Sequence, residues 1–285
     1  MRLKGSRAIV TGGSQGLGLA IARKFVEEGA HVVICGRDPE PLEHAHREIQ
    51  CLRADARVIA TSADVSKPEA VDALVALARQ ELGGVDALIC SAGVHGAKGA
   101  LETVDWDEWK QAIEINLFGA VLACRAVVPI MKAQGRGKIV LLSGGGATKP
   151  MPRLSAYAAS KAAVVRFGET LAQELEAWNI DVNAVAPGAV NTRLLNDILE
   201  AGPERVGAAF HARAQCQKAE GGTPPSLAAE LCVFLASDRS NGISGRLLSA
   251  VWDPWDRLPE LAERLRETDI YTLRRIVPND RGAPW

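Results

Sequence analysis

The stretch Thr11-Gly12-Gly13-Ser14-Gln15-Gly16-Leu17-Gly18 follows the apolar run 7–10 and precedes a helical pattern over 17–28. A strand, a glycine-rich turn and a helix in this order suit the pyrophosphate of a dinucleotide, because a helix N-terminus offers free N–H groups and partial positive charge. Gly12 permits the tight turn, Gly16 lets the backbone approach the phosphates, and Gly18 lets the helix lie close to the sheet. A plain strand–helix turn is the alternative, but the flanking pattern favours a dinucleotide site.

Short apolar runs alternate with helical patterns along the rest of the chain. The expected strands cover 7–10, 31–35, 57–61, 85–90, 138–143, 181–186 and 246–251. The expected helices cover 17–28, 40–52, 68–82, 106–133, 156–178 and 226–236. Near-continuous apolar strands separated by helices indicate a parallel sheet that is covered on both faces. We therefore expect an α/β fold: a doubly wound, seven-stranded Rossmann sheet in three α/β/α layers.

Two segments depart from this alternation. The long mixed segment 193–222 follows the sixth expected strand, at the carboxyl edge where such sheets bind ligands. We assign it to a single domain of residues 1–251, as its substrate loop. Residues 252–285 form a C-terminal extension with Trp252, Trp255 and Trp285 as large apolar anchors. We expect this extension to pack on the domain or on a partner subunit, near the mouth of the site.

The composition excludes several kinds of partner. The 285 residues are 47% hydrophobic and 24% charged, with a net charge of −1, which argues against nucleic acid and anionic membrane surfaces. No apolar run looks long enough to span a bilayer, and no signal-like segment precedes the first strand, so we expect a cytoplasmic protein. The six cysteines contain no CxxC pair, which predicts reduced thiols and no metal site.

A second informative run is Ser155-Ala156-Tyr157-Ala158-Ala159-Ser160-Lys161. Tyr157 and Lys161 are four residues apart on an expected helix and so share a face. A free tyrosine has a pKa of about 10, and a neighbouring ammonium can lower that pKa by stabilising the phenolate. A tyrosine tuned in this way can exchange a proton with a hydroxyl or carbonyl oxygen. An ordinary surface pair would have the same spacing.

Together, and in this order, the two motifs resemble the short-chain dehydrogenase/reductase family, from residue 7 to about residue 251. The resemblance implies a catalytic set of Asn116, Ser143, Tyr157 and Lys161, in which Asn116 holds a water that links the lysine to solvent. It also implies a small-molecule substrate and a homodimer or homotetramer. The implied cofactor-binding residues are Gly12, Ser14, Gln15, Gly16, Leu17, Gly18, Arg37, Asp64, Val65, Ser91, Ala92, Gly93, Tyr157, Lys161, Pro187, Gly188, Val190 and Thr192.

The sequence departs from the family pattern at the catalytic serine. That serine is commonly the second of a pair, and here the pair reads Ser143-Gly144. Strand alternation would turn Ser143 to the opposite face, unless a slip in the glycine run 144–146 brings its hydroxyl into place. The glycine amides or Thr148 could instead polarise the carbonyl. These alternatives remain open from sequence.

The end of the second expected strand bears on the choice of cofactor. Relatives that prefer NAD usually carry an acidic residue where this chain has Gly36, and Arg37 resembles an arginine that pairs with the 2′-phosphate of NADP. The basic residue that many NADP-preferring relatives carry in the glycine turn is replaced by Gln15. We expect NADP, with NAD as the alternative.

We therefore expect an NAD(P)-dependent oxidoreductase that acts on a secondary alcohol or ketone. The alternatives are a nucleotide-binding protein without redox turnover, favoured by the altered serine motif, and a related sugar-nucleotide epimerase or dehydratase. A basic rim predicts a polar or anionic substrate, although such a rim is also typical of a solvated surface. Its residues are His95, Lys98, Lys149, Arg153, Arg193 and Arg205.

Overall fold

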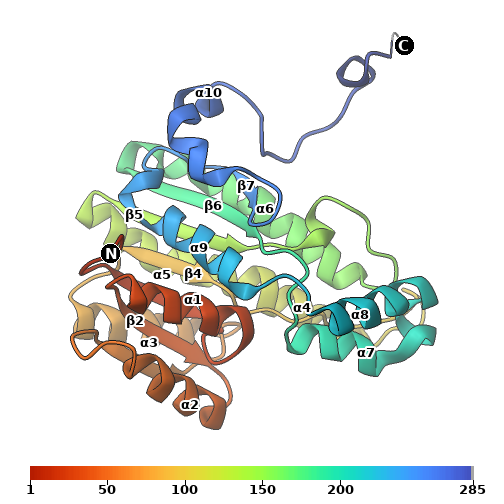
Figure 1. The fold of residues 1–285 in the computed structure, drawn as a ribbon, viewed down its shortest axis with the longest axis horizontal. Coiled ribbons are helices and arrows are strands. Elements are labelled where there is room, and N and C mark those ends of the chain that lie inside the picture. Colours follow the sequence, from red (N-terminus) through yellow and green to blue (C-terminus); the bar gives the residue numbers. More distant parts are fainter. Residues whose placement is uncertain (284–285) are drawn as a thin grey trace.

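Seven parallel strands form one sheet in the computed structural model, which describes residues 1–283 (Figure 1). The strands are β1 (Arg7–Thr11), β2 (His31–Gly36), β3 (Val58–Ser62), β4 (Ala87–Cys90), β5 (Gly137–Leu142), β6 (Ile180–Ala186) and β7 (Leu247–Ser249). Their order is β3-β2-β1-β4-β5-β6-β7, so the connections change direction between β1 and β4. In a doubly wound sheet this switch point opens a crevice at the carboxyl ends of the strands. The expected fold class is confirmed.

Helices cover both faces of the sheet. Successive side chains of a strand point to opposite faces, so the apolar strands form two separate cores, one on each face. Along β5, Val140 and Leu142 join the core on one face, and Ile139 and Leu141 join the core on the other. The first face carries α1 (Gly16–Glu27), α2 (Pro39–Gln50) and α9 (Pro225–Ala236). The opposite face carries α3 (Pro68–Leu82), α5 (Gly119–Gln134) and α6 (Ser155–Leu175), and α4 (Trp106–Ile113) packs against α6.

The helix expected over 106–133 is interrupted by a π-helical turn at Glu114–Phe118, between α4 and α5. The whole stretch is 29 residues long and has a mean hydropathy of 1.7 in its most apolar window. This corrects the expectation that no run is long enough to span a bilayer. Its buried residues Ala123, Val127 and Met131 pack in the core beside the sheet. Core helices pass the same test of length and hydropathy, so these values do not place the chain in a membrane.

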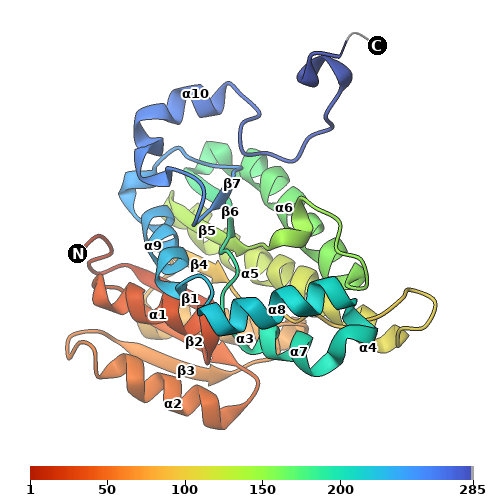
Figure 2. The same cartoon turned by 45° about the vertical axis from the view of Figure 1, so that its right-hand side comes forward.

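The segment 193–222 forms two helices, α7 (Arg193–Val206) and α8 (Ala208–Glu220). Figure 2 shows them side by side beyond the carboxyl ends of the strands, in front of the sheet. Helical geometry is broken at Gly202, and Gly207 separates the two helices with a φ of 89°. A small third core joins them to α6, with Leu154, Leu195, Ile198, Val206 and Ala214 as its buried members.

The chain after β7 packs against its own domain. A 3-10 turn (Trp255–Leu261) leads into α10 (Ala262–Arg266), and Leu258 and Leu265 are buried in the core on the α1/α9 face. The buried Arg246 guanidinium donates hydrogen bonds to the Thr268 carbonyl at 2.9 Å and the Ile270 carbonyl at 2.8 Å, and also to the carbonyl of Leu265.

The tail also reaches the edge strand and α6. The Leu247 amide in β7 donates to the Tyr271 carbonyl at 2.7 Å, and Glu169 in α6 accepts a hydrogen bond from the Leu273 amide at 2.6 Å. Trp252 is 82% exposed, whereas Trp255 lies against Phe234 of α9. The third predicted anchor, Trp285, lies outside the described residues.

Candidate active site

The glycine-rich turn between β1 and α1 has no room for side chains. Gly12 and Gly16 have φ angles of 66° and 56°, which favour glycine. A Cβ at Gly12 would lie 2.8 Å from the Ala92 Cα, and a Cβ at Gly18 would lie 2.1 Å from the Gly12 carbonyl oxygen. Both glycines are therefore required for close packing inside the turn, and with Gly16 they also line the cleft at the start of α1, where a pyrophosphate would lie. These residues fit a dinucleotide.

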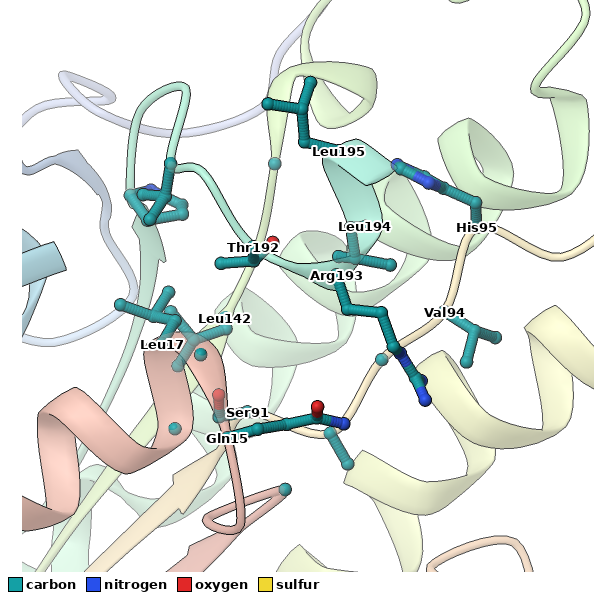
Figure 3. Close-up of a pocket in the computed structure, with 18 of the residues that line it drawn as sticks. Gln15, Leu17, Ser91, Val94, His95, Leu142, Thr192, Arg193, Leu194 and Leu195 are labelled. Atoms are coloured by element: carbon teal, nitrogen blue, oxygen red, sulfur yellow. The ribbon is translucent and has the colours of Figure 1, made fainter. Parts of the chain in front are cut away.

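A cleft of about 380 Å³ runs along the carboxyl ends of the strands and past this turn. Figure 3 shows Gln15, Leu17 and Ser91 on its turn side and Thr192, Arg193 and Leu194 at the start of α7. All the predicted cofactor-binding residues line it: Gly12, Ser14, Gln15, Gly16, Leu17, Gly18, Arg37, Asp64, Val65, Ser91, Ala92, Gly93, Tyr157, Lys161, Pro187, Gly188, Val190 and Thr192. None of the tail residues 252–283 lines it.

Tyr157 and Lys161 lie on the cleft side of α6, as their spacing predicts. The Tyr157 hydroxyl lies directly against Gly144, because a Cβ built at Gly144 would be 2.4 Å from it. The Lys161 Nζ lies 5.8 Å from the centre of the Tyr157 ring and donates a hydrogen bond to the Leu142 carbonyl at 2.7 Å. The end of β5 therefore positions both side chains.

Burial controls the charge states of these two groups. It raises the pKa of the Tyr157 phenol to about 12 and lowers the pKa of Lys161 to about 8. The expected lowering of the tyrosine pKa by its lysine neighbour is therefore not produced by the protein atoms alone. At neutral pH the phenol keeps its proton, which is the form that can donate to a carbonyl oxygen.

Asn116 lies behind the wall of the cleft and does not line it. Its side-chain amide donates to the Val94 carbonyl and to Ser160 Oγ, both at 2.9 Å, and its Oδ1 accepts from the Val94 amide at 2.8 Å. A Cβ at Gly93 would lie within 3.3 Å of Asn116 Oδ1 and 3.5 Å of Lys161 Nζ. The π-helical turn thus places Asn116 beside the lysine, and its role in a water relay stays a prediction.

Ser143 is buried at the end of β5, and its Oγ has no hydrogen-bond partner. Gly144 is extended, with a φ of −174°, so the alternation of the strand continues through it. Since the Cβ direction of Gly144 points at the Tyr157 hydroxyl, the Ser143 side chain points away from that hydroxyl. The structure shows no bulge that would reverse this.

His95 is the predicted rim residue that lies deepest in the site. Only 8% of its surface is exposed, and its ring packs edge-on against the Tyr157 ring, with centroids 4.7 Å apart and an interplanar angle of 69°. Its Nδ1 is buried and has no partner. Burial, assisted by the charges of Lys98 and Lys161, lowers the pKa of His95 to about 4, so the ring is neutral at pH 7.

Most of the other basic residues of the expected rim hold loops together. Arg153 donates to the Glu204 carbonyl at 2.5 Å, Arg205 donates to the Lys98 carbonyl at 3.2 Å, and Lys98 donates to the Gly96 carbonyl at 3.2 Å. Lys149 is exposed and lies outside the cleft. Of the six residues of the expected rim, two line the cleft, His95 and Arg193.

The cleft has an apolar wall near Tyr157 that the sequence did not predict, although Arg193, Arg213 and Gln217 of α7 and α8 also line the cleft. The wall is formed at the end of the cleft near Tyr157 by Met151, Leu195, Ile198, Phe210 and Ala214. Four of these residues belong to α7 and α8. The apolar residues of segment 193–222 could have predicted this wall, but the many charged residues of the same segment obscured them.

Comparison with known proteins agrees with this geometry. A family model described as short chain dehydrogenase matches residues 6–202. A 3beta-hydroxysteroid dehydrogenase 1 of Eggerthella lenta is 38% identical over 252 residues, which cover 86% of this chain and 92% of that protein. The crystal structure of levodione reductase aligns with a TM-score of 0.81 and 28% identity, over 91% of this chain and 99% of that one. The NAD⁺-bound crystal structure of xylitol dehydrogenase aligns with a TM-score of 0.80 and 26% identity, over 87% of this chain and 98% of that one.

Proposed function

Since the chain belongs to the short-chain dehydrogenase family, we propose that it interconverts an apolar, cyclic ketone and its secondary alcohol with NADP(H). The coarser statement is already established by the relatives and the cleft: the protein is an oxidoreductase that uses a nicotinamide cofactor and acts on alcohol and ketone groups. The non-redox alternative finds no support among the relatives described above, and neither does an epimerase or dehydratase.

The residues of the cleft divide the chemistry between them. A bound nicotinamide supplies or accepts the hydride at the substrate carbon. The glycine turn and the N-terminus of α1 would hold the phosphates of the cofactor. Tyr157 passes its hydroxyl proton to the substrate oxygen during reduction and takes it back during oxidation. Lys161, buried beside it, stabilises the phenolate that remains.

The apolar wall supports the proposed substrate class. Leu195, Ile198 and Phe210 face the end of the cleft at which Tyr157 lies. Such a surface gains free energy by covering hydrocarbon, at about 25 cal/mol per Å². Leu195, Ile198 and Phe210 favour an apolar substrate over the polar or anionic one that the expected basic rim suggested, although Arg193 and Arg213 also line the cleft. The relative from Eggerthella lenta is named for a hydroxysteroid, a compound of this apolar, polycyclic kind.

The end of β2 supports the choice of NADP. A Cβ at Gly36 would lie 2.8 Å from Ser14 Oγ, so the strand end has no room for an acidic side chain. Arg37 lines the cleft at the next position and is exposed there. A guanidinium suits the dianionic 2′-phosphate that distinguishes NADP from NAD. Asp38 lines the same region, which keeps NAD as the second candidate.

We further propose that the protein is a homodimer or homotetramer assembled on the α4–α5 face, where Trp106 is 61% exposed and Phe118 is 51% exposed. Exposed aromatic side chains are enriched at contacts between subunits. The cytoplasmic location stays a prediction.

The test of the function is Tyr157→Phe, assayed as consumption of NADPH with a panel of cyclohexanone, decalone and a ketosteroid. The phenyl ring keeps the packing against His95, so NADPH binding and thermal unfolding serve as controls that should not change. We expect turnover to fall at least about 1,000-fold, since the proton donor is lost. Unchanged turnover of any ketone that the wild type reduces would contradict the assignment.

A further inference from the structure

In the family pattern a serine is a second hydrogen-bond donor to the reacting oxygen besides the tyrosine, and residue 144 has no side chain to supply one. Gly144 has no side chain, and the Tyr157 hydroxyl occupies the space that a Cβ would need, at 2.4 Å. Ser143 points away from that hydroxyl, because successive residues of an extended strand face opposite sides. No side chain therefore occupies position 144, where the family pattern has its serine, and Ser143, which lines the cleft with an unpartnered Oγ, is the competing donor.

His95 is the polar side chain best placed to take over this role. It follows β4 in the loop that lines the cleft, and it contacts the Tyr157 ring directly, with ring centroids 4.7 Å apart. Its Nδ1 is buried without any partner. Buried polar atoms are nearly always hydrogen-bonded, so an orphaned nitrogen beside the proton donor marks a place for a ligand atom.

We propose that the His95 imidazole donates a hydrogen bond to the substrate oxygen, alongside the Tyr157 hydroxyl. This inference rests on the proposed ketone–alcohol chemistry. The neutral ring carries one N–H, and this role requires that N–H on the unpartnered Nδ1 rather than on the nitrogen that faces the Leu194 backbone. Lys98 and Lys161 are the charged groups that face it, and both oppose its protonation.

The His95 ring lies against the start of α7. Figure 3 shows His95 beside Leu194 and Leu195 in the first turn of this helix, and the Leu194 backbone partly offsets the lowering of the His95 pKa. The same turn carries residues of the apolar wall. A substrate seated against α7 would therefore meet the imidazole and the phenol together.

The test compares His95→Leu, which removes the donor, with His95→Gln, which keeps an N–H. Both are assayed with NADPH and a ketone from the same panel that the wild type reduces, so failure of the proposed function would already appear in the wild type. We expect His95→Leu to lower kcat about 100-fold with little change in KM, as for the loss of an oxyanion donor, and His95→Gln to recover most of the loss. The Kd for NADPH should stay unchanged in both.

Ser143→Ala measures the competing donor in parallel. The proposal requires that kcat falls further in His95→Leu than in Ser143→Ala. It is overturned if Ser143→Ala shows the larger loss, or if His95→Leu keeps kcat within about threefold of the wild type. It is also overturned if His95→Gln is as impaired as His95→Leu while both bind NADPH normally. If His95→Leu does not fold, His95→Phe takes its place, because it keeps the aromatic contact with Tyr157.

Discussion

Restoring the serine of the family pattern by Gly144→Ser should impair this enzyme. The new Cβ would lie 2.4 Å from the Tyr157 hydroxyl, whereas an ordinary contact begins at 3.4 Å, so the phenol must move by about 1 Å. A displacement of this size at a reacting group can cost about 100-fold in rate. We therefore expect kcat for ketone reduction to fall about 100-fold, measured as NADPH consumption, with the Kd for NADPH within about threefold of the wild type.

Gly145→Ala is the matched control, because no atom lies within 4 Å of a Cβ at that position. Its kcat should stay within about threefold of the wild type. The reasoning is refuted if Gly144→Ser matches or exceeds the wild type, since the added hydroxyl would then be accommodated and useful. A crystal structure of the variant would show the displaced phenol directly.

Three further changes test other parts of the structure. Arg37→Ser should raise the Kd for NADPH about tenfold or more and the Kd for NADH by less than about threefold. An equal loss of affinity for both cofactors would refute the contact with the 2′-phosphate. The pKa of His95 is about 4 when folded and about 6.5 when unfolded, so the folded state loses up to about 3 kcal/mol as the pH falls between these values. Urea unfolding should show this loss in the wild type and not in His95→Leu. Arg246→Ala should lower the unfolding free energy by about 3 kcal/mol because it frees the buried carbonyls of the tail, whereas the exposed Arg264→Ala should have little effect.

The fold could be predicted from the sequence because its signals are local. The helix expected over 68–82 agrees with α3, and the glycines at 12, 16 and 18 meet the close contacts that their spacing implies. The π-helical turn at Glu114–Phe118 could not be foreseen, since it adds one residue to a helical pattern without a change in composition. Its effect is to direct Asn116 inward, beside Lys161.

The site was harder to predict where it depends on contacts between distant segments. His95 and Arg153 both looked like rim residues, but one is buried against Tyr157 and the other is bonded to the Glu204 carbonyl. The pKa of Tyr157 was predicted from its lysine neighbour, while burial dominates it. The altered serine motif left several donors open; the direction of the Cβ at Gly144 argues against Ser143, Thr148 does not line the cleft, and the amides of Gly144 and Gly145 are not tested by it.

The tail segment that follows β7 has a consequence for how this protein meets other copies of itself. β7 is only three residues long and is the last strand of the sheet, so its outward amides would offer a template for pairing with a foreign strand. The Tyr271 carbonyl already accepts the Leu247 amide. The tail therefore protects this rim of the sheet from edge-to-edge aggregation, and a neighbouring molecule that approached here would meet side chains rather than an open ladder.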